Sequence, residues 1–106
     1  MSDIDKKLDD ARNSAGEYGR LYGAKETADD YLKITYAGLY EGTTGTVAER
    51  DAWVKTQEAY RAAVQRKQNA YADFKVAETE MKITFTEAEI WRTECANNRF
   101  MDRAHR

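Results

Sequence analysis

The second half of the chain carries apolar residues at every seventh position. Between Thr46 and Arg106 there is neither glycine nor proline. The residues of this repeat are Trp53, Tyr60, Phe74, Met81, Ala88 and Cys95, and only Lys67 interrupts it. Three or four residues after its members lie further apolar residues: Ala63, Val64, Ala70, Tyr71, Ala77, Phe85 and Trp91. Such spacing is typical of a helix that packs along another helix in a coiled coil. It predicts one long helix over about 47–103.

A similar repeat runs through the first part of the chain. Its members are Ile4, Leu8, Ala11, Ala15, Tyr18, Tyr22, Ala28, Leu32, Tyr36 and Leu39, with a skip at Lys25. This predicts a first helix over about 3–41. Three glycines weaken the prediction, since each costs up to about 1 kcal/mol relative to alanine inside a helix; they are Gly16, Gly19 and Gly23. A break near Gly23 is one alternative. The favoured alternative is that the glycines let aromatic rings of a partner approach the backbone closely.

A short loop separates the two predicted helices. Gly42 and Gly45 end the first helix, and Thr46 with Glu49 forms a capping box for the second. Because a five-residue loop (42–46) leaves the helices side by side, we expect an all-α fold: an elongated antiparallel helical hairpin with coiled-coil-like packing, forming a single domain over 1–106. Folding about the loop pairs positions whose numbers sum to about 88. A kink near Thr84–Thr86 is an alternative, because the segment from Met81 alternates apolar and polar residues like a strand.

The second helix is predicted to extend past the first. At 1.5 Å per residue the two helices measure roughly 85 Å and 58 Å, so residues beyond about Phe85 have no partner within the chain. A second apolar line, Val76, Ile83 and Ile90, lies about 200° around the helix from Phe74. A helix that is apolar on two sides needs two neighbours. We therefore predict an oligomeric bundle whose interface comprises Val76, Ile83, Ile90, Trp91, Cys95, Phe100 and Met101.

Composition and charge exclude several classes of function. A net charge of −2, from 19 acidic and 17 basic residues, is not that of a general nucleic-acid binder. The acidic start of the chain is no secretory signal, and no apolar run approaches the roughly 20 residues needed to cross a bilayer, so we expect a cytoplasmic protein without membrane contact. The only histidine is His105 and the only cysteine is Cys95. We therefore predict no catalytic, metal or cofactor site and no small-molecule substrate.

The C-terminal segment is basic and contains an aromatic residue. The side chains that would contact nucleic acid are Arg92, Asn97, Asn98, Arg99, Arg103 and Arg106, with Phe100 among them. Such a set can bind phosphates and stack on bases. The competing interpretation is that the basic residues complement the dipole at the helix C-terminus.

The segment Ile90-Trp91-Arg92 … Asn97-Asn98-Arg99 resembles small proteins of tailed bacteriophages that have long helices and end in a Trp-Arg … Asn-Asn-Arg segment. The resemblance covers about the last third of the chain. It implies an accessory protein of the phage early region, in the bacterial host cytoplasm, that works near DNA metabolism or against a host defence factor. It implies no catalytic residue.

These observations lead to two hypotheses of function. The first is a non-enzymatic accessory protein that self-associates and binds another macromolecule, which we expect to be a protein. The second is a nucleic-acid-binding recombination accessory that uses the arginine-rich end. Salt dependence distinguishes them, since phosphate binding weakens steeply as salt rises and an apolar interface does not.

Overall fold

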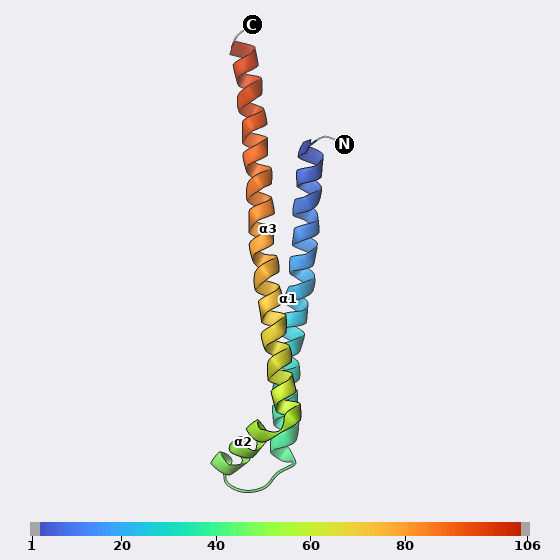
Figure 1. The fold of residues 1–106 in the computed structure, drawn as a ribbon, viewed down its shortest axis with the longest axis vertical. Helices are drawn as coiled ribbons and strands as arrows, with labels where there is room; N and C mark the ends of the chain where they lie inside the picture. Colours follow the sequence, from blue (N-terminus) through green and yellow to red (C-terminus); the bar gives the residue numbers. More distant parts are fainter. Residues whose placement is uncertain (1–2, 105–106) are drawn as a thin grey trace. The chain divides into compact units, whose positions relative to one another are not determined.

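The computed structural model contains three α-helices: α1 (Asp3–Glu41), α2 (Val47–Thr56) and α3 (Glu58–Ala104) (Figure 1). It describes residues 3–104, apart from the side chains of Ile4, Asp102 and Ala104. No strand occurs within these residues. The predicted all-α fold class is confirmed.

Helix α1 has the predicted extent and passes through its glycines without a break. A Cβ atom added at Gly16, Gly19 or Gly23 would meet nothing within 4 Å. The alternative of a break near Gly23 is therefore wrong. The expectation that a partner's aromatic rings approach these glycines stays a prediction, and no ring of the facing helix lies within 4 Å of these Cβ positions.

The predicted loop and its cap are confirmed. The Gly42 amide donates to the carbonyl oxygen of Gly38 at 3.1 Å as α1 ends. Gly45 has φ of +127°, a conformation that residues with a side chain rarely adopt. Helix α2 begins after Thr46, whose Oγ1 accepts a hydrogen bond from the Glu49 amide at 3.2 Å.

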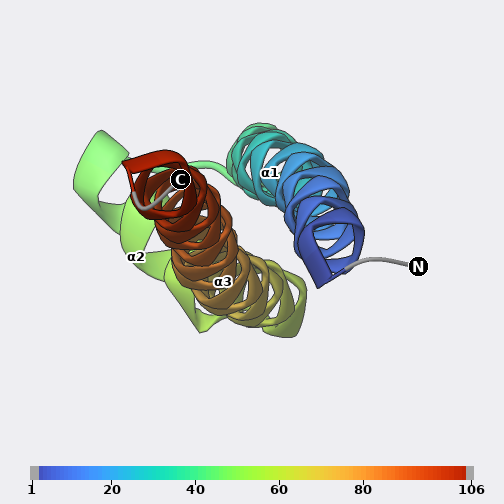
Figure 2. The same cartoon turned by 90° about the horizontal axis from the view of Figure 1, so that it is seen from above.

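The prediction of one helix over 47–103 is wrong at Gln57. This residue is extended, with φ −77° and ψ 139°, and separates α2 from α3. Two side chains compete with the helical hydrogen bonds here, since Thr56 Oγ1 and Gln57 Nε2 both donate to the Trp53 carbonyl, at 2.6 and 3.3 Å. As a result α2 lies at an angle to the start of α3 instead of continuing it (Figures 1 and 2).

The alternative of a kink at Thr84–Thr86 is also wrong, because α3 is one continuous α-helix from Glu58 to Ala104. Thr84 Oγ1 donates to the Met81 carbonyl one turn earlier at 3.0 Å, a bond that a threonine makes inside a helix. The alternating segment therefore stays helical.

The chain divides into two compact units, which are described separately. The first combines the chain up to Gly19 with the chain from Val76 onward, and the second spans Arg20–Lys75. In the second unit α1 and α3 pack antiparallel, as predicted: Tyr22 contacts Phe74 with ring centroids 5.8 Å apart, and Tyr36 contacts Tyr60 at 6.2 Å.

The pairing register differs from the predicted one. Both of these aromatic pairs have residue numbers that sum to 96, not to about 88. The position of α2 causes this shift in register. Residues 47–56 were expected to form the first turns of one long helix and to pair with α1. With α2 turned aside, the long helix that pairs with α1 starts only at Glu58.

Small side chains dominate the buried positions of both units. The buried residues are Ala11, Ala77 and Ala88 in the first unit and Ala28, Val54, Ala63 and Phe74 in the second. Most of the predicted α3 seam is therefore buried or half-buried. Phe85 is an exception at 47% exposed, because its neighbour Thr84 takes the seam position.

The unpaired end of α3 begins later in the chain than predicted, at residue 96 instead of about Phe85. Ala88 is only 4% exposed, and Trp91 and Cys95 are half-buried. Within the first unit Trp91 shares a shallow hollow with Lys7 of α1, so it has a partner in its own chain. Residues 96–101 are all exposed, and the overhang begins there.

Candidate interaction surface of α3

Large apolar side chains are exposed along the part of α3 that belongs to the first unit. Besides Phe85 they are Val76 (59% exposed), Ile83 (51%), Ile90 (53%), Phe100 (72%) and Met101 (53%). These are five of the seven residues that the sequence assigned to an oligomer interface. The other two, Trp91 and Cys95, lie half-buried on the side of α3 that faces α1.

Val76, Ile83 and Ile90 form a straight apolar line on one side of α3. Residues seven apart on a helix are about 10.5 Å apart along its axis and share a face. Ile83 lies about 140° around the helix from the buried Ala88, so the line points away from the seam with α1. No residue of the described chain covers this line, and each of its members is more than half exposed.

The line borders a shallow hollow beside α1. Ile90 and Trp91 line this space of about 320 Å³ together with Lys7, Glu87 and Glu94. The indole Nε1–H of Trp91 is buried and has no hydrogen-bond partner among the described residues. The hollow therefore combines apolar walls with a rim of one lysine and two glutamates.

The predicted nucleic-acid residues do not form one cluster. Arg92, Arg99 and Arg103 are exposed and lie within about 40° of one another around α3. Asn97 and Asn98 point to other sides of the helix, more than about 80° from the arginines. Arg106 lies outside the described residues.

The end of α3 also binds its own backbone. Arg99 Nε donates to the Cys95 carbonyl, one turn earlier in the same helix, at 3.4 Å. Ala96, Phe100 and Arg103 surround Arg99 in a shallow hollow of about 220 Å³.

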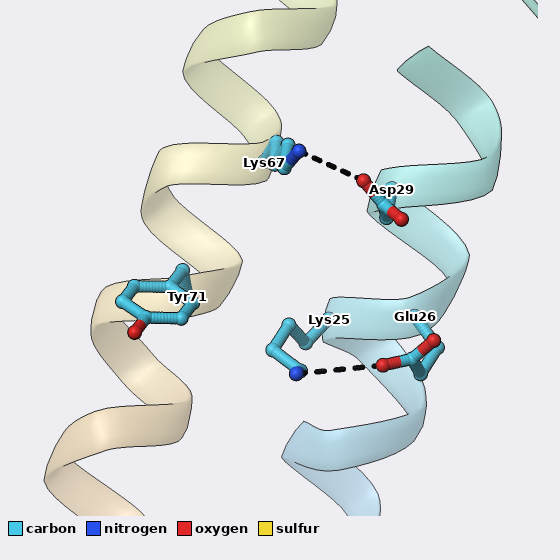
Figure 3. Close-up of a pocket in the computed structure, with 5 residues that line it drawn as sticks. All are labelled: Lys25, Glu26, Asp29, Lys67 and Tyr71. Atoms are coloured by element: carbon cyan, nitrogen blue, oxygen red, sulfur yellow. Dashed lines mark ion pairs between the residues drawn. The ribbon is translucent and has the colours of Figure 1, made fainter. Parts of the chain in front are cut away.

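The two lysines that interrupt the apolar repeats lie at one polar pocket in the second unit (Figure 3). Lys67 of α3 contacts Asp29 of α1 at 2.8 Å, and Lys25 contacts Glu26 at 3.4 Å. Tyr71 completes the lining of this space of about 230 Å³. Its two ion pairs balance in charge, so it has no excess charge with which to attract a charged ligand.

These contacts change the proton affinities of the charged groups. Hydrogen bonds from Lys67 and then Lys33 lower the pKa of the Asp29 carboxyl. The same bond to Asp29 raises the pKa of Lys67. Both shifts keep the groups charged near neutral pH, as expected for an ion pair that fixes the helix register and not for an acid–base catalyst.

A tyrosine cluster, which the sequence analysis did not identify as a site, connects α2 to the end of α1. Tyr36 donates a hydrogen bond to Asp51 Oδ1 at 2.6 Å and stacks on Tyr40 at 5.9 Å. The Arg50 guanidinium lies 3.9 Å from the Tyr40 ring centroid and donates to the Tyr40 carbonyl at 2.7 Å. The hydrogen bond to Asp51 raises the pKa of Tyr36 to about 12. This cluster holds α2 in its angled position.

Neither a metal site nor a membrane span emerges from the described part of the chain. Among residues 3–104 no group of three or more metal-ligating His, Cys, Asp or Glu side chains comes together. None of the described helices is both long and apolar enough to cross a bilayer.

The line of Val76, Ile83 and Ile90 is thus the longest exposed apolar line described on α3. Comparison of the chain with protein-family models, with curated proteins and with solved structures finds no match.

Proposed function

We propose that the protein is a non-enzymatic binding protein that self-associates through α3 and acts on another macromolecule. The observation that supports this proposal is the line of Val76, Ile83 and Ile90, each more than half exposed on the side of α3 away from the seam. Isolated exposed apolar residues are normal on protein surfaces, whereas a continuous line at helical spacing is typical of an interface.

The energetics favour covering this line. Full burial of a large aliphatic side chain stabilises by roughly 1.5–3 kcal/mol, and a two-fold interface would cover three of them on each copy. Association costs an opposing 4–15 kcal/mol in lost freedom of motion. Phe100 and Met101 on the exposed end add apolar area to the favourable side of this balance.

The phage resemblance of the last third suggests where such a protein would act. An accessory protein of this kind would meet its partner, a phage or host protein of DNA metabolism or defence, in the cytoplasm of the bacterial host. A helical scaffold with an exposed apolar surface suits binding to a protein more than turnover of a small molecule.

The proposal is tested by the mass of the protein in solution. Sedimentation equilibrium at about 100 μM detects any association stronger than roughly −5.5 kcal/mol. We expect the wild type to be oligomeric and Ile83→Lys with Ile90→Lys to be monomeric, with helical circular dichroism retained. Ile34→Lys is the matched control, since Ile34 is 71% exposed on α1 and belongs to the second unit. A monomeric wild type would refute self-association.

A second candidate function is nucleic-acid binding through the basic end. The observation that favours it is the common face of Arg92, Arg99 and Arg103 on α3. We expect Arg99→Gln to weaken binding to single-stranded or duplex DNA and to flatten its salt dependence, while Arg61→Gln on an exposed position of the second unit leaves both unchanged. Absence of binding at low salt removes this candidate.

A further inference from the structure

The exposed side of α3 in the first unit repeats a short pattern three times. Each repeat has Val or Ile first, threonine three residues later and glutamate four residues later. The members are Val76, Thr79 and Glu80; Ile83, Thr86 and Glu87; and Ile90, Thr93 and Glu94. All nine side chains are exposed. Two seven-residue repeats therefore share one helix, one facing α1 and the other facing away from it.

The outer repeat has the residue types of a dimeric coiled coil. Its first position holds β-branched aliphatic residues and continues to Asn97, while its second position holds threonines and continues to Phe100. β-branched residues at the first position favour parallel dimers, and a single asparagine there specifies register and oligomer state. A helical threonine can bond its hydroxyl to the preceding turn, which leaves its methyl group for packing.

The charges beside this repeat decide the direction of pairing. In an antiparallel pair each flank of the helix meets the same flank of the other copy. The flank of Glu80, Glu87 and Glu94 would then meet itself, and every contact along it would join two carboxylates. An antiparallel pair of α3 helices is therefore disfavoured in any register.

A parallel pair brings opposite flanks together. In register, Lys82 then lies beside Glu87 of the second copy, an attractive contact made twice by symmetry. Lys82 currently contacts Glu78 of its own helix at 3.6 Å and is 70% exposed, so it can reach outward. Glu89 lies beside Glu94 of the second copy, an unfavourable contact that symmetry also makes twice.

We propose that two copies pair through α3 in parallel and in register along Val76–Phe100, with the apolar line of each copy against the same line of the other. This pairing rests on the proposed self-association and adds its stoichiometry and direction. Helix α1 stays on the far side of each α3 in the first unit, so the pairing needs no change in that packing.

Cysteine cross-linking tests the direction. In a Cys95→Ser background, Ile83→Cys and Asn97→Cys are made as separate variants, and each is oxidised. A disulfide needs Cβ atoms about 3.5–4.5 Å apart, so both variants form linked dimers only if each residue meets itself. Arg92→Cys, on the opposite side of the helix, is the control and stays monomeric on denaturing gels.

The unfavourable contact provides a second test. Glu89→Lys places a lysine beside Glu94 of the second copy, and we expect dimerisation to tighten by roughly threefold or more at low salt. Glu89→Gln should give a smaller gain. In an antiparallel pair the same substitution replaces a contact between two glutamates by a contact between two lysines. Dimerisation is then not tightened.

The outcomes separate this inference from the function on which it rests. A dimer that cross-links only when Val76→Cys and Phe100→Cys variants are mixed is antiparallel, which overturns the inference and leaves self-association intact. A wild type that stays monomeric overturns both. Linked dimers from Ile83→Cys and from Asn97→Cys, with tightening by Glu89→Lys, support the parallel pair.

Discussion

The Nζ atom of Lys67 on α3 lies 2.8 Å from Oδ1 of Asp29 on α1, at the one position where the apolar repeat of α3 is interrupted (Figure 3). A leucine at this position would continue the seam without breaking the repeat. A polar residue in a coiled-coil seam specifies register at some cost in stability. The ion pair therefore favours the observed register of the second unit, together with the aromatic pairs Tyr22–Phe74 and Tyr36–Tyr60.

We expect Lys67→Leu to weaken the acid dependence of stability. The lowered pKa of Asp29 means that its contribution is present above the ordinary aspartate pKa and is lost as pH falls through the lowered value. Without Lys67 this loss between about pH 4 and pH 2 becomes smaller, as thermal unfolding at both pH values would show. Lys33→Gln removes the longer contact to Asp29 at 3.3 Å and should have a smaller effect in the same direction. An unchanged acid dependence in Lys67→Leu would contradict this role.

Alanine at the open glycines of α1 should stabilise the protein. Gly16, Gly19 and Gly23 are helical, and an added Cβ meets nothing within 4 Å. Each replacement should raise the free energy of unfolding by about 0.5–1 kcal/mol, measured by urea unfolding. Gly45→Ala should lower it, since Gly45 has φ of +127° and a Cβ there would lie 2.9 Å from Glu49 Oε2. Destabilisation by all three α1 variants would instead indicate that another chain covers this face.

Much of the helical structure could be predicted from local pattern alone. The loop 42–46, the cap at Thr46 and the seam through Phe74 and Ala88 follow from glycine placement, capping chemistry and seven-residue spacing. The end of α2 at Gln57 could not, because no glycine or proline marks it. It depends on side-chain hydrogen bonds to one carbonyl and on contacts between α2 and α1 that are distant in sequence.

Because the break at Gln57 was not predicted, some predictions about the candidate sites were also wrong. An uninterrupted second helix implied the wrong register, so Trp91 was expected in an unpartnered overhang although it lies beside Lys7. The skips at Lys25 and Lys67 were visible in the sequence, but the pairing of Lys67 with Asp29, whose numbers sum to 96, required the true register. The line of Val76, Ile83 and Ile90 could be predicted without knowing how α3 pairs with α1, because the periodicity of a single helix places these residues on one face.

The packing of α2 can be tested with two valines of the same helix. Val54 is fully buried, whereas Val47 is 72% exposed. We expect Val54→Ala to lower the free energy of unfolding by about 1–3 kcal/mol through lost burial and a cavity, and Val47→Ala to change it by less than about 0.5 kcal/mol. Chemical denaturation measures both. Equal effects would mean that α2 is not held against the rest of the second unit.

The hydrogen bond between Tyr36 and Asp51 predicts an alkaline transition. Because the folded pKa of Tyr36 is raised to about 12, its contribution is present below the ordinary tyrosine pKa of about 10 and is lost as pH rises from there through 12. The tyrosinate absorbance of the wild type minus that of Tyr36→Phe should therefore appear near pH 12. In Asp51→Asn the same difference should move toward pH 10. A difference signal near pH 10 in the wild type would show that the bond is not made in solution.

Because the indole N–H of Trp91 is buried without a partner among the described residues, we expect replacement of Trp91 by phenylalanine to change stability little. Its Nε1–H is buried without a hydrogen-bond partner among the described residues, and an unsatisfied buried donor costs about 1–3 kcal/mol. Trp91→Phe removes that donor and keeps much of the ring, so the gain offsets the lost volume and the free energy of unfolding should change by less than about 1 kcal/mol. Trp91→Ala removes the packing as well and should cost up to about 3 kcal/mol.

Urea unfolding followed by circular dichroism measures both Trp91 variants at one protein concentration, because dimer stability depends on concentration. Phe85→Ala is the matched control in α3, since Phe85 is 47% exposed and lies off the seam. If Trp91→Phe costs as much as Trp91→Ala, the indole N–H has an acceptor in solution. Glu87 and Glu94, which line the same hollow, are then the nearest carboxylates to test, by Glu87→Gln and Glu94→Gln. If neither substitution reproduces the cost of Trp91→Phe, the acceptor belongs to a second copy, and that cost should fall as the protein is diluted to the monomer.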